Sequence, residues 1–343
     1  MHRIDKARLT DFGVQFLLAQ GVSADNATFL AQGAVLTESF GVHTHGVAIF
    51  GYWDKMLGDA IHPTAEPKVV KERAATALVD GNLAFGPLAL KRAREIAADK
   101  ARASGIAMVA VNNTTWIGAC GTHILPLAQA GLFAQLWTQT NTCKDCAPWG
   151  GIDAKFSTNP ISLAFPTGTL PVLADFSTSA LSMGKTATMA KAGQKAPENL
   201  FLDKDGTLTD DPRVVAEGGS LLFTGGEHYG YRGYGLSLWV EALTAMGGGS
   251  ANNPDLPTRQ CFNLTVIDPE AFAGADTYTT EIKRFLAHMR TSRLRPGFDA
   301  ILLPGERAQK AAQDAAAHGV TVSEAVFDTL QELAAKHGLQ PLA

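Results

Sequence analysis

Apolar side chains recur at helical spacing in two neighbouring segments near the start of the chain, residues 9–19 and 23–39. Gly21 between them is a stop signal, and Ser23 is a suitable N-cap for the second segment. A third helical pattern covers residues 45–57 and ends before Gly58. The pattern therefore predicts three consecutive helices before the first strand.

Short apolar runs then alternate with helical segments through the middle of the chain. The predicted strands are residues 77–80, 106–111, 131–138, 160–165 and 171–176. The predicted helices are residues 87–104, 121–130, 234–246, 279–291 and 322–337, with a Gly-, Asn- and Pro-rich loop at 247–257. This alternation predicts an α/β protein with a three-layer core.

Composition narrows the class of protein. The chain has 343 residues, 18% charged residues, 46% hydrophobic residues and a formal net charge of −4. It carries no basic stripe, so we expect no nucleic-acid partner. No apolar run reaches transmembrane length and residues 1–6 lack an apolar h-region, so we expect no membrane association, no signal peptide and a cytoplasmic location. The length suits one elaborate domain or two intimate lobes.

Familiar phosphate-binding motifs are incomplete in this sequence. The glycines of residues 230–235 do not have the G-x-G-x-x-G spacing of a Rossmann fingerprint. Residues 183–186 (MGKT) resemble half of a P-loop, but Ser179 stands where the first glycine is required. The favoured interpretation of residues 183–186 is a turn with a solvated lysine.

Cys143 and Cys146 form a C-x-x-C pair. Such a pair serves redox chemistry or supplies half of a zinc site. A zinc or redox protein would need the pair to converge with His43 or His45, and the sequence offers no second cluster of paired ligands. We therefore expect two buried or half-buried thiols beside a pocket, and no metal.

His45 is the leading candidate for proton transfer. Thr44 is a plausible N-cap for the helix predicted from residue 45, which would place His45 beside the partial positive charge of a helix N-terminus. That charge would disfavour imidazolium and leave the ring suited to general acid–base chemistry. The alternative is a structural histidine, which is the commoner role for a lone His-x-His.

Several separated segments resemble the type-2 malate/L-lactate dehydrogenase family, and they occur in that family's order. The family includes sulfolactate, ureidoglycolate, diketogulonate and piperideine-2-carboxylate (cyclic-imine) oxidoreductases. The matching segments are residues 41–47 (GVHTHGV), 111–121, 140–142, 148–151, 157–161, 175–179 (DFSTS), 232–237 (RGYGLS), 266–269 and 303–306. Any one of these matches is weak, but together they are strong evidence.

The resemblance implies a fold and an assembly. It implies a non-Rossmann NAD(P)-binding fold of the L-sulfolactate dehydrogenase-like type, with a mixed sheet, N- and C-terminal helices and an intertwined homodimer. The expected division is an N-terminal helical part of a substrate and dimer lobe at 1–75, an NAD(P)-binding α/β lobe at 76–254, and a C-terminal part at 255–343 that returns to the first lobe.

The resemblance also implies site residues. Carried onto matching positions, it makes His45 the proton donor and acceptor, with Thr44 beside it. The residues implied to line the dinucleotide are Thr142, Asp175, Phe176, Ser177, Thr178, Arg232, Gly233 and Glu306. A carboxylate suits ribose hydroxyls, so Asp175 favours NAD over NADP, and Arg232 suits a pyrophosphate. The alternative for Asp175 is a helix cap.

Two positions depart from the family pattern in the expected substrate pocket. Ile49 stands where the family usually has an arginine that suits a substrate carboxylate, and Trp116 stands where it usually has a histidine. The remaining polar candidates for this pocket are His43, Lys144 and His123. Trp116 either packs in the core or forms a wall against the nicotinamide or an unsaturated substrate. We therefore expect simple 2-oxo acids to be poor substrates.

Together these features predict an oxidoreductase that uses NAD or NADP. It would transfer hydride between nicotinamide and a small 2-hydroxy/2-oxo acid or a cyclic imine carboxylate. The alternative is a dinucleotide-binding regulatory or scaffold protein without ordinary 2-oxo-acid turnover, which the losses at Ile49 and Trp116 would explain.

Overall fold

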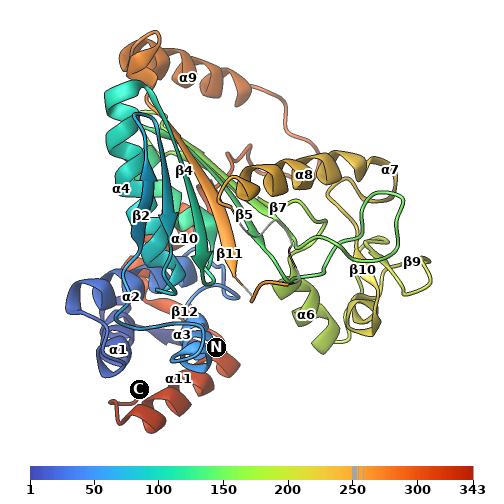
Figure 1. Ribbon diagram of the computed structural model, residues 1–343. Helices are drawn as coiled ribbons and strands as arrows, with labels where there is room; N and C mark the ends of the chain where they lie inside the picture. The colour runs from blue at the N-terminus through green and yellow to red at the C-terminus, as the bar shows by residue number, and fades with distance from the viewer. Residues whose placement is uncertain (249–252, 254, 258, 343) are drawn as a thin grey trace.

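The centre of the protein is a seven-stranded sheet, seen in the computed structural model of residues 1–248, 253, 255–257 and 259–342 (Figure 1). In spatial order its strands are β2 (Lys68–Glu72), β3 (Thr76–Asp80), β4 (Ile106–Thr114), β11 (Gln260–Ile267), β5 (Phe133–Thr140), β6 (Pro160–Phe165) and β7 (Val172–Ser177). Only β3 and β4 pair in parallel, and every other neighbouring pair is antiparallel. The sheet is therefore mixed, as expected.

Helices cover both faces of this sheet. On one face, α4 (Gly86–Ser104) packs on β4 and β11, and α5 (Cys120–Gln129) packs on β5 and β6. Their apolar side chains meet Phe262, Leu264 and Val266 of β11 in one buried cluster. The alternate residues of β11 point to the other face, where α8 (Tyr231–Ala245) packs on β5 and β11. The prediction of a three-layer α/β core is confirmed.

A separate group of helices brings together the N-terminal and C-terminal parts of the chain. It contains α1 (Lys6–Ala19), α2 (Ala24–Ser39), α3 (Ile49–Met56), α10 (Glu306–His318) and α11 (Glu324–His337). The two-stranded pairing of β1 (His2–Ile4) with β12 (Val320–Val322) ties the N-terminal and C-terminal parts together (Figure 1). Their apolar side chains form a separate buried cluster that includes Phe16, Phe50 and Trp53.

A small unit lies beyond β7. It holds α6 (Met183–Lys191), η1 (Pro212–Glu217), α7 (Gly226–Tyr229) and a three-stranded sheet of β8 (Phe201–Leu202), β9 (Leu208–Thr209) and β10 (Ser220–Leu221). After β11, η2 (Pro269–Ala271) leads into α9 (Ala275–Met289), which has no buried residue. Figure 1 shows α9 at the far end of the sheet from the terminal helices.

Several expected elements differ from the structure. The helix expected from residue 45 begins instead at Ile49, after a series of turns, and residues 183–186 open helix α6 rather than forming an isolated turn. The central strand β11, the edge strand β2 and helix α10 had no counterpart among the predicted elements. Of the expected loop at 247–257, residues 249–252 and 254 lie outside the described residues, and the described part contains neither helix nor strand.

The sheet does not follow the expected lobe boundaries. Strand β2 lies within the expected first part and β11 within the expected last part, yet both pair into the sheet of the middle part. The division into lobes at residues 75 and 254 therefore stays a prediction. Strand pairing within the central sheet joins residues on both sides of each of these boundaries. Among the helices that the structure describes, none combines the length and the apolar character needed to cross a bilayer.

Candidate active site

The turn that carries His45 wraps around a buried carboxylate. Glu38, near the end of α2, has a side chain that is 0% exposed. Its Oε2 accepts a hydrogen bond from the backbone N–H of Val47 at 3.0 Å, and its Oε1 lies 2.6 Å from Nδ1 of His43. One carboxylate therefore holds both sides of the turn and fixes where His45 sits.

Gly46 is required by this arrangement. A Cβ at this position would lie 2.0 Å from Oε2 of Glu38 and 2.8 Å from its Cα. The missing side chain lets the carboxylate pass beneath the turn to the backbone of Val47. The glycine of the His-Gly pair therefore serves the packing of α2 against the turn.

His45 lies in a turn and not in a helix, which corrects the predicted capping role of Thr44. The residue at the N-cap position of α3 is Ala48, and it makes no side-chain cap. Oγ1 of Thr44 instead lies 2.8 Å from Nδ1 of His45 and fixes the orientation of the ring. Burial lowers the pKa of His45 to about 4, so the cause of the shift is desolvation and not the expected helix N-terminus.

This pKa decides the protonation state of the free site. At neutral pH the imidazole of His45 is uncharged, and one ring nitrogen is free to accept a proton. A neutral imidazole is the form that takes the proton of a hydroxyl group during oxidation.

Trp116 lies between two other rings. Its ring centroid is 4.9 Å from that of His45, with the planes inclined at 59°. On its other side, Tyr52 of α3 meets it edge-on at 4.7 Å and 74°. Tyr52 is 38% exposed and was not among the predicted site residues. Tyr52 lies within the helix predicted at residues 45–57, and no motif around it pointed to the site.

The loop that presents Trp116 is fixed on both sides. Thr115 Oγ1 accepts from the backbone N–H of Gly86 at 2.9 Å. The N–H of Ile117 donates to Oε1 of Gln260 at 2.9 Å, and its carbonyl accepts from Nε2 of His123 at 2.8 Å. The indole is therefore held by its backbone before any ligand binds.

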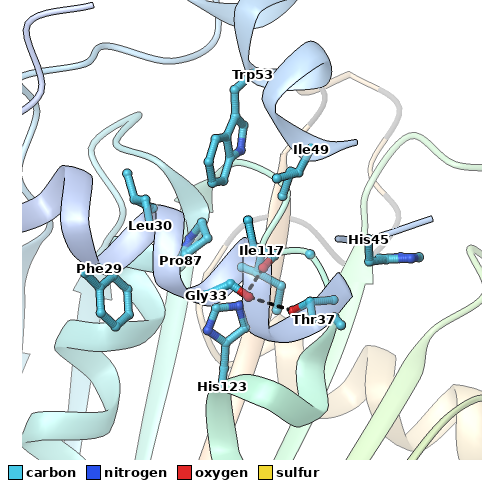
Figure 2. A pocket seen from close by; sticks show the side chains of 13 residues that line it. Phe29, Leu30, Gly33, Thr37, His45, Ile49, Trp53, Pro87, Ile117 and His123 are labelled. Carbon is cyan, nitrogen blue, oxygen red and sulfur yellow. Dashed lines mark hydrogen bonds between the residues drawn. The ribbon is translucent and has the colours of Figure 1, made fainter. Parts of the chain in front are cut away.

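Two predicted pocket residues belong to the core. Ile49 is 3% exposed, and His123 is buried with its pKa lowered to about 4, chiefly by burial. Both border a small cavity of about 10 Å³, shown in Figure 2 with Trp53 and Ile117 on its wall. In this view the ring of His45 points away from the cavity. Ile49 and His123 therefore support the site from behind and do not face it.

The other polar candidates are spread around the turn. The exposed His43 has its pKa raised, mainly by its hydrogen bond to Glu38, which already occupies it. Lys144 is exposed in the loop after β5. Its neighbour Cys143 lies close to Tyr52, whose pKa is raised by burial and then by this cysteine.

The cysteine pair behaves as expected for packed thiols. Cys143 is half-buried, Cys146 is buried, and both are free. Burial, followed by the nearby Asp145, raises the pKa of Cys143 to about 11 and that of Cys146 well above its ordinary value. Both groups are therefore thiols at neutral pH and poor nucleophiles. Within the described part of the chain, no cluster of His, Cys, Asp and Glu could hold a metal ion.

Three of the expected cofactor segments converge on β7. The carbonyl of Pro304 accepts from the N–H of Leu173, and a Cβ at Gly305 would lie 2.7 Å from Leu173. At the other end of β7, a Cβ at Gly233 would lie 2.8 Å from the carbonyl of Thr178. Gly233 thus lets the start of α8 pack directly on the end of β7.

The carboxylate of Asp175 accepts a hydrogen bond from within the protein. The residue is exposed at the surface of β7, and its Oδ2 accepts from the N–H of Gly121 in the first turn of α5 at 2.8 Å. Desolvation by the protein atoms packed around the carboxyl group raises its pKa to about 6. The capping alternative therefore describes it, although the helix is α5 and not the next one along the chain. The hydroxyls of Ser177 and Thr178 bond to the carbonyls of Ser179 and Thr158, while Phe176 is 42% exposed.

Arg232 has the free charge that a dinucleotide needs. Its guanidinium lies over the rings of Tyr229 and Tyr231, and no carboxylate of the described chain pairs with it in an ion pair. Glu306, in contrast, pairs with Arg290 and Lys310 and accepts from the N–H of Leu303, so its carboxylate is occupied. Thr142 is half-buried just beyond β5.

The turn that bears His45 and the segments expected to bind the cofactor form one continuous region. A Cβ at Gly184, in the first turn of α6, would lie 3.0 Å from Thr44, so α6 links the His45 turn to β7. Asp175 joins β7 to α5, which follows the Trp116 loop directly. An exposed aromatic side chain, an unneutralised guanidinium and close backbone packing fit a dinucleotide at this end of the sheet.

Nearly the whole chain is similar to proteins of one known family. The malate/L-lactate dehydrogenase family matches residues 4–331. A malate dehydrogenase from Pyrococcus abyssi is 30% identical over 99% of this chain and 96% of its own length. A Δ¹-pyrroline-2-carboxylate/Δ¹-piperideine-2-carboxylate reductase from Pseudomonas putida is 32% identical over 91% of each chain. The structure of sulfolactate dehydrogenase from Methanocaldococcus jannaschii superposes with a TM-score of 0.89 at 28% identity, covering 99% of this chain and 98% of that one. The protein is therefore an oxidoreductase that belongs to the malate/L-lactate dehydrogenase family.

Proposed function

We propose that this protein is a dehydrogenase or reductase that transfers hydride between NAD(P) and the C2 carbon of a small carboxylic acid. The substrate would be a 2-hydroxy/2-oxo acid or a cyclic imine carboxylate, as the names of the relatives suggest. The bound nicotinamide would supply or accept the hydride. His45 would accept the substrate proton in oxidation and return it in reduction.

One observation carries this proposal: a neutral imidazole is held in a fixed orientation beside two partly exposed rings. Thr44 orients His45, and Glu38 fixes the turn that bears it. Proton transfer by a positioned histidine typically accelerates a reaction by about 10²–10⁴-fold. The core-packed alternative for His45 requires a fully buried ring, which describes His123, whereas His45 is partly exposed.

The dinucleotide would lie along β7 and the start of α8. Arg232 would pair with the pyrophosphate, while Gly233, Phe176 and the strand 175–178 would line the bound cofactor, with Thr142 and Glu306 at its margins. The cofactor could be NAD or NADP. The preference for NAD in the sequence analysis depended on the carboxylate of Asp175. This carboxylate accepts a hydrogen bond from α5, so the structure favours neither dinucleotide.

We further propose a homodimer in the cytoplasm. Helix α9 buries none of its own residues and exposes Phe285. The outer face of α8 exposes Leu236, Leu238 and Trp239. Exposed apolar faces of this kind are typical of subunit interfaces. Light scattering at micromolar concentration that shows only monomer would remove the dimer.

A second candidate function keeps the dinucleotide site without turnover. Its support is that Ile49 packs in the core and Trp116 has no titratable group, so two residues usual at these positions are missing. Isothermal calorimetry with NADH and NADPH tests the cofactor site. A panel of 2-oxo acids and cyclic imines, followed by nicotinamide absorbance, then separates the enzyme from the binding protein. If neither dinucleotide binds, both candidates are wrong.

A further inference from the structure

Trp116 forms the middle of a three-ring cluster on the side of the site that faces solvent. The cluster consists of His45, Trp116 and Tyr52, which come from the turn after α2, the loop before α5 and helix α3. All three rings are partly exposed, whereas the nearby Trp53 is 1% exposed and lies in the core. Trp116 is thus an apolar plate next to the proton-transfer group.

The charges around this cluster do not suit a second carboxylate on the substrate. The exposed His43 is paired with Glu38, and Ile49 offers no charge. On the far side of Tyr52, the half-buried Cys143 lies beside Asp145. A negatively charged side group placed against the rings would therefore meet apolar surface and a nearby acidic residue. The exposed Lys144, which stands between Cys143 and Asp145 in the sequence, is the nearest lysine along this loop, and the three rings themselves include no fixed cation.

The backbone of Trp116 makes this surface rigid. Its two neighbours are bonded to three separate elements, through Gly86 of α4, Gln260 of β11 and His123 of α5. A ring held in this way gives up little freedom when it contacts a ligand, so the contact favours binding of a flat or apolar group. Aromatic pairs of this kind are worth about 0.5–1.5 kcal/mol beyond the apolar area that they bury, which corresponds to roughly twofold to tenfold in affinity.

We propose that Trp116 is a specificity-determining residue that selects substrates with one carboxylate and a flat or large apolar side group over dicarboxylates. This inference rests on the proposed function, because it names the substrate class of the same site. Phenylpyruvate represents the favoured class and oxaloacetate the disfavoured one. Both carry the same 2-oxo acid group and differ in the part that would face the indole.

The test compares kcat/KM for these two substrates in the intact protein with its preferred dinucleotide. We expect the wild-type protein to favour phenylpyruvate by at least about tenfold, because one misplaced or unmatched group in a pocket is worth about 10–200-fold. Trp116→His should lower this ratio by about tenfold or more, and Trp116→Phe should keep it within about threefold. The ratio is informative because loss of folded protein affects both substrates equally.

Trp53→Phe is the matched control. It removes a tryptophan from the core of the same lobe, where the indole N–H has no partner among the described residues. The ratio of the two substrates should not change in this variant. Calorimetry should show the same dinucleotide affinity in all four proteins.

The outcomes separate the inference from the proposed function. Dinucleotide binding without turnover of any 2-oxo acid or cyclic imine would end the proposed activity, and the inference with it. Turnover that favours oxaloacetate in the wild-type protein would overturn the inference alone. An unchanged ratio in Trp116→His would also overturn the inference. If that variant does not fold, the wild-type ratio tests the inference together with Trp116→Phe, which should keep the ratio within about threefold.

Discussion

Replacing Glu38 by glutamine would test whether a buried carboxylate holds the catalytic turn. The amide has nearly the same shape, so no cavity forms. Its carbonyl oxygen can still accept from the N–H of Val47, and its NH₂ group can donate to Nδ1 of a neutral His43. What is lost is the negative charge behind both hydrogen bonds.

The magnitude follows from these two bonds. Hydrogen bonds to charged groups contribute about 1.5–3 kcal/mol and neutral ones about 0.5–1.5 kcal/mol, so losing the charge on two bonds costs about 2 kcal/mol of unfolding free energy. Removing the desolvation cost of a buried charge offsets part of this loss. The turn that bears His45 should also loosen, and kcat should fall by about tenfold while dinucleotide affinity stays the same.

The loss should depend on pH with a defined sign. Glu38 raises the pKa of His43 in the folded protein. The resulting stabilisation is fully present below the unfolded pKa of about 6.5 and is lost as the pH rises through the higher folded pKa. The side chain of His43 is 46% exposed, so this part is small, at most about 1 kcal/mol after solvent screening. The gap between wild type and Glu38→Gln should therefore be wider near pH 6 than near pH 9.

Urea unfolding at several pH values, together with kcat, measures both effects. Glu324→Gln is the matched control, because Glu324 also pairs with a histidine, His2, but is 68% exposed. We expect this control to change neither stability nor kcat appreciably. If Glu38→Gln unfolds at the wild-type urea concentration and keeps full kcat, the carboxylate does not hold the turn.

Three further substitutions test other parts of the site. His45→Asn should lower kcat by about 10²–10⁴-fold and leave dinucleotide affinity nearly unchanged, and full activity would exclude His45 from proton transfer. Arg232→Ala should weaken NADH or NADPH binding about tenfold to a hundredfold in calorimetry, whereas Arg284→Ala on α9 should not. His123→Gln should be less stable than wild type at about pH 8. Because the pKa of His123 falls to about 4 on folding, wild type should lose more stability than the variant as the pH falls from about 6.5 to about 4, and parallel pH profiles would contradict this.

Local patterns predicted the elements whose signals lie within a few residues of one another. Ser23 stands at the N-cap position of helix α2 as expected, although its side chain makes no capping hydrogen bond, and the strands with apolar runs appear within a few residues of their predicted limits. Strand β11 was missed because its role depends on pairing with β4 and β5, which are far away in sequence. A local strand signal was present, because residues 262–266 alternate apolar and polar side chains, but this signal could not show the strand's central position or the burial of both its faces.

The sequence singled out candidate residues for the site, but it did not show which contacts set their positions and pKa values. His45 was found from its turn, yet its low pKa comes from burial that no local pattern encodes. Glu38 escaped notice because it stands inside a helical pattern, and only the path of the following turn brings Val47 to it. Tyr52 was missed for a similar reason, since its contact with Trp116 joins two segments separated by three strands and a helix.

If His45 is the proton donor that we propose, its pKa links proton transfer to the choice of substrate. With a pKa of about 4, the free imidazole is ready to accept a proton but carries almost none to donate at neutral pH. A bound carboxylate would raise this pKa, because a nearby negative charge favours imidazolium. Reduction would therefore depend on the substrate's own carboxylate to charge the proton donor. One carboxylate is sufficient for this effect, which is consistent with a site whose other wall is the indole of Trp116.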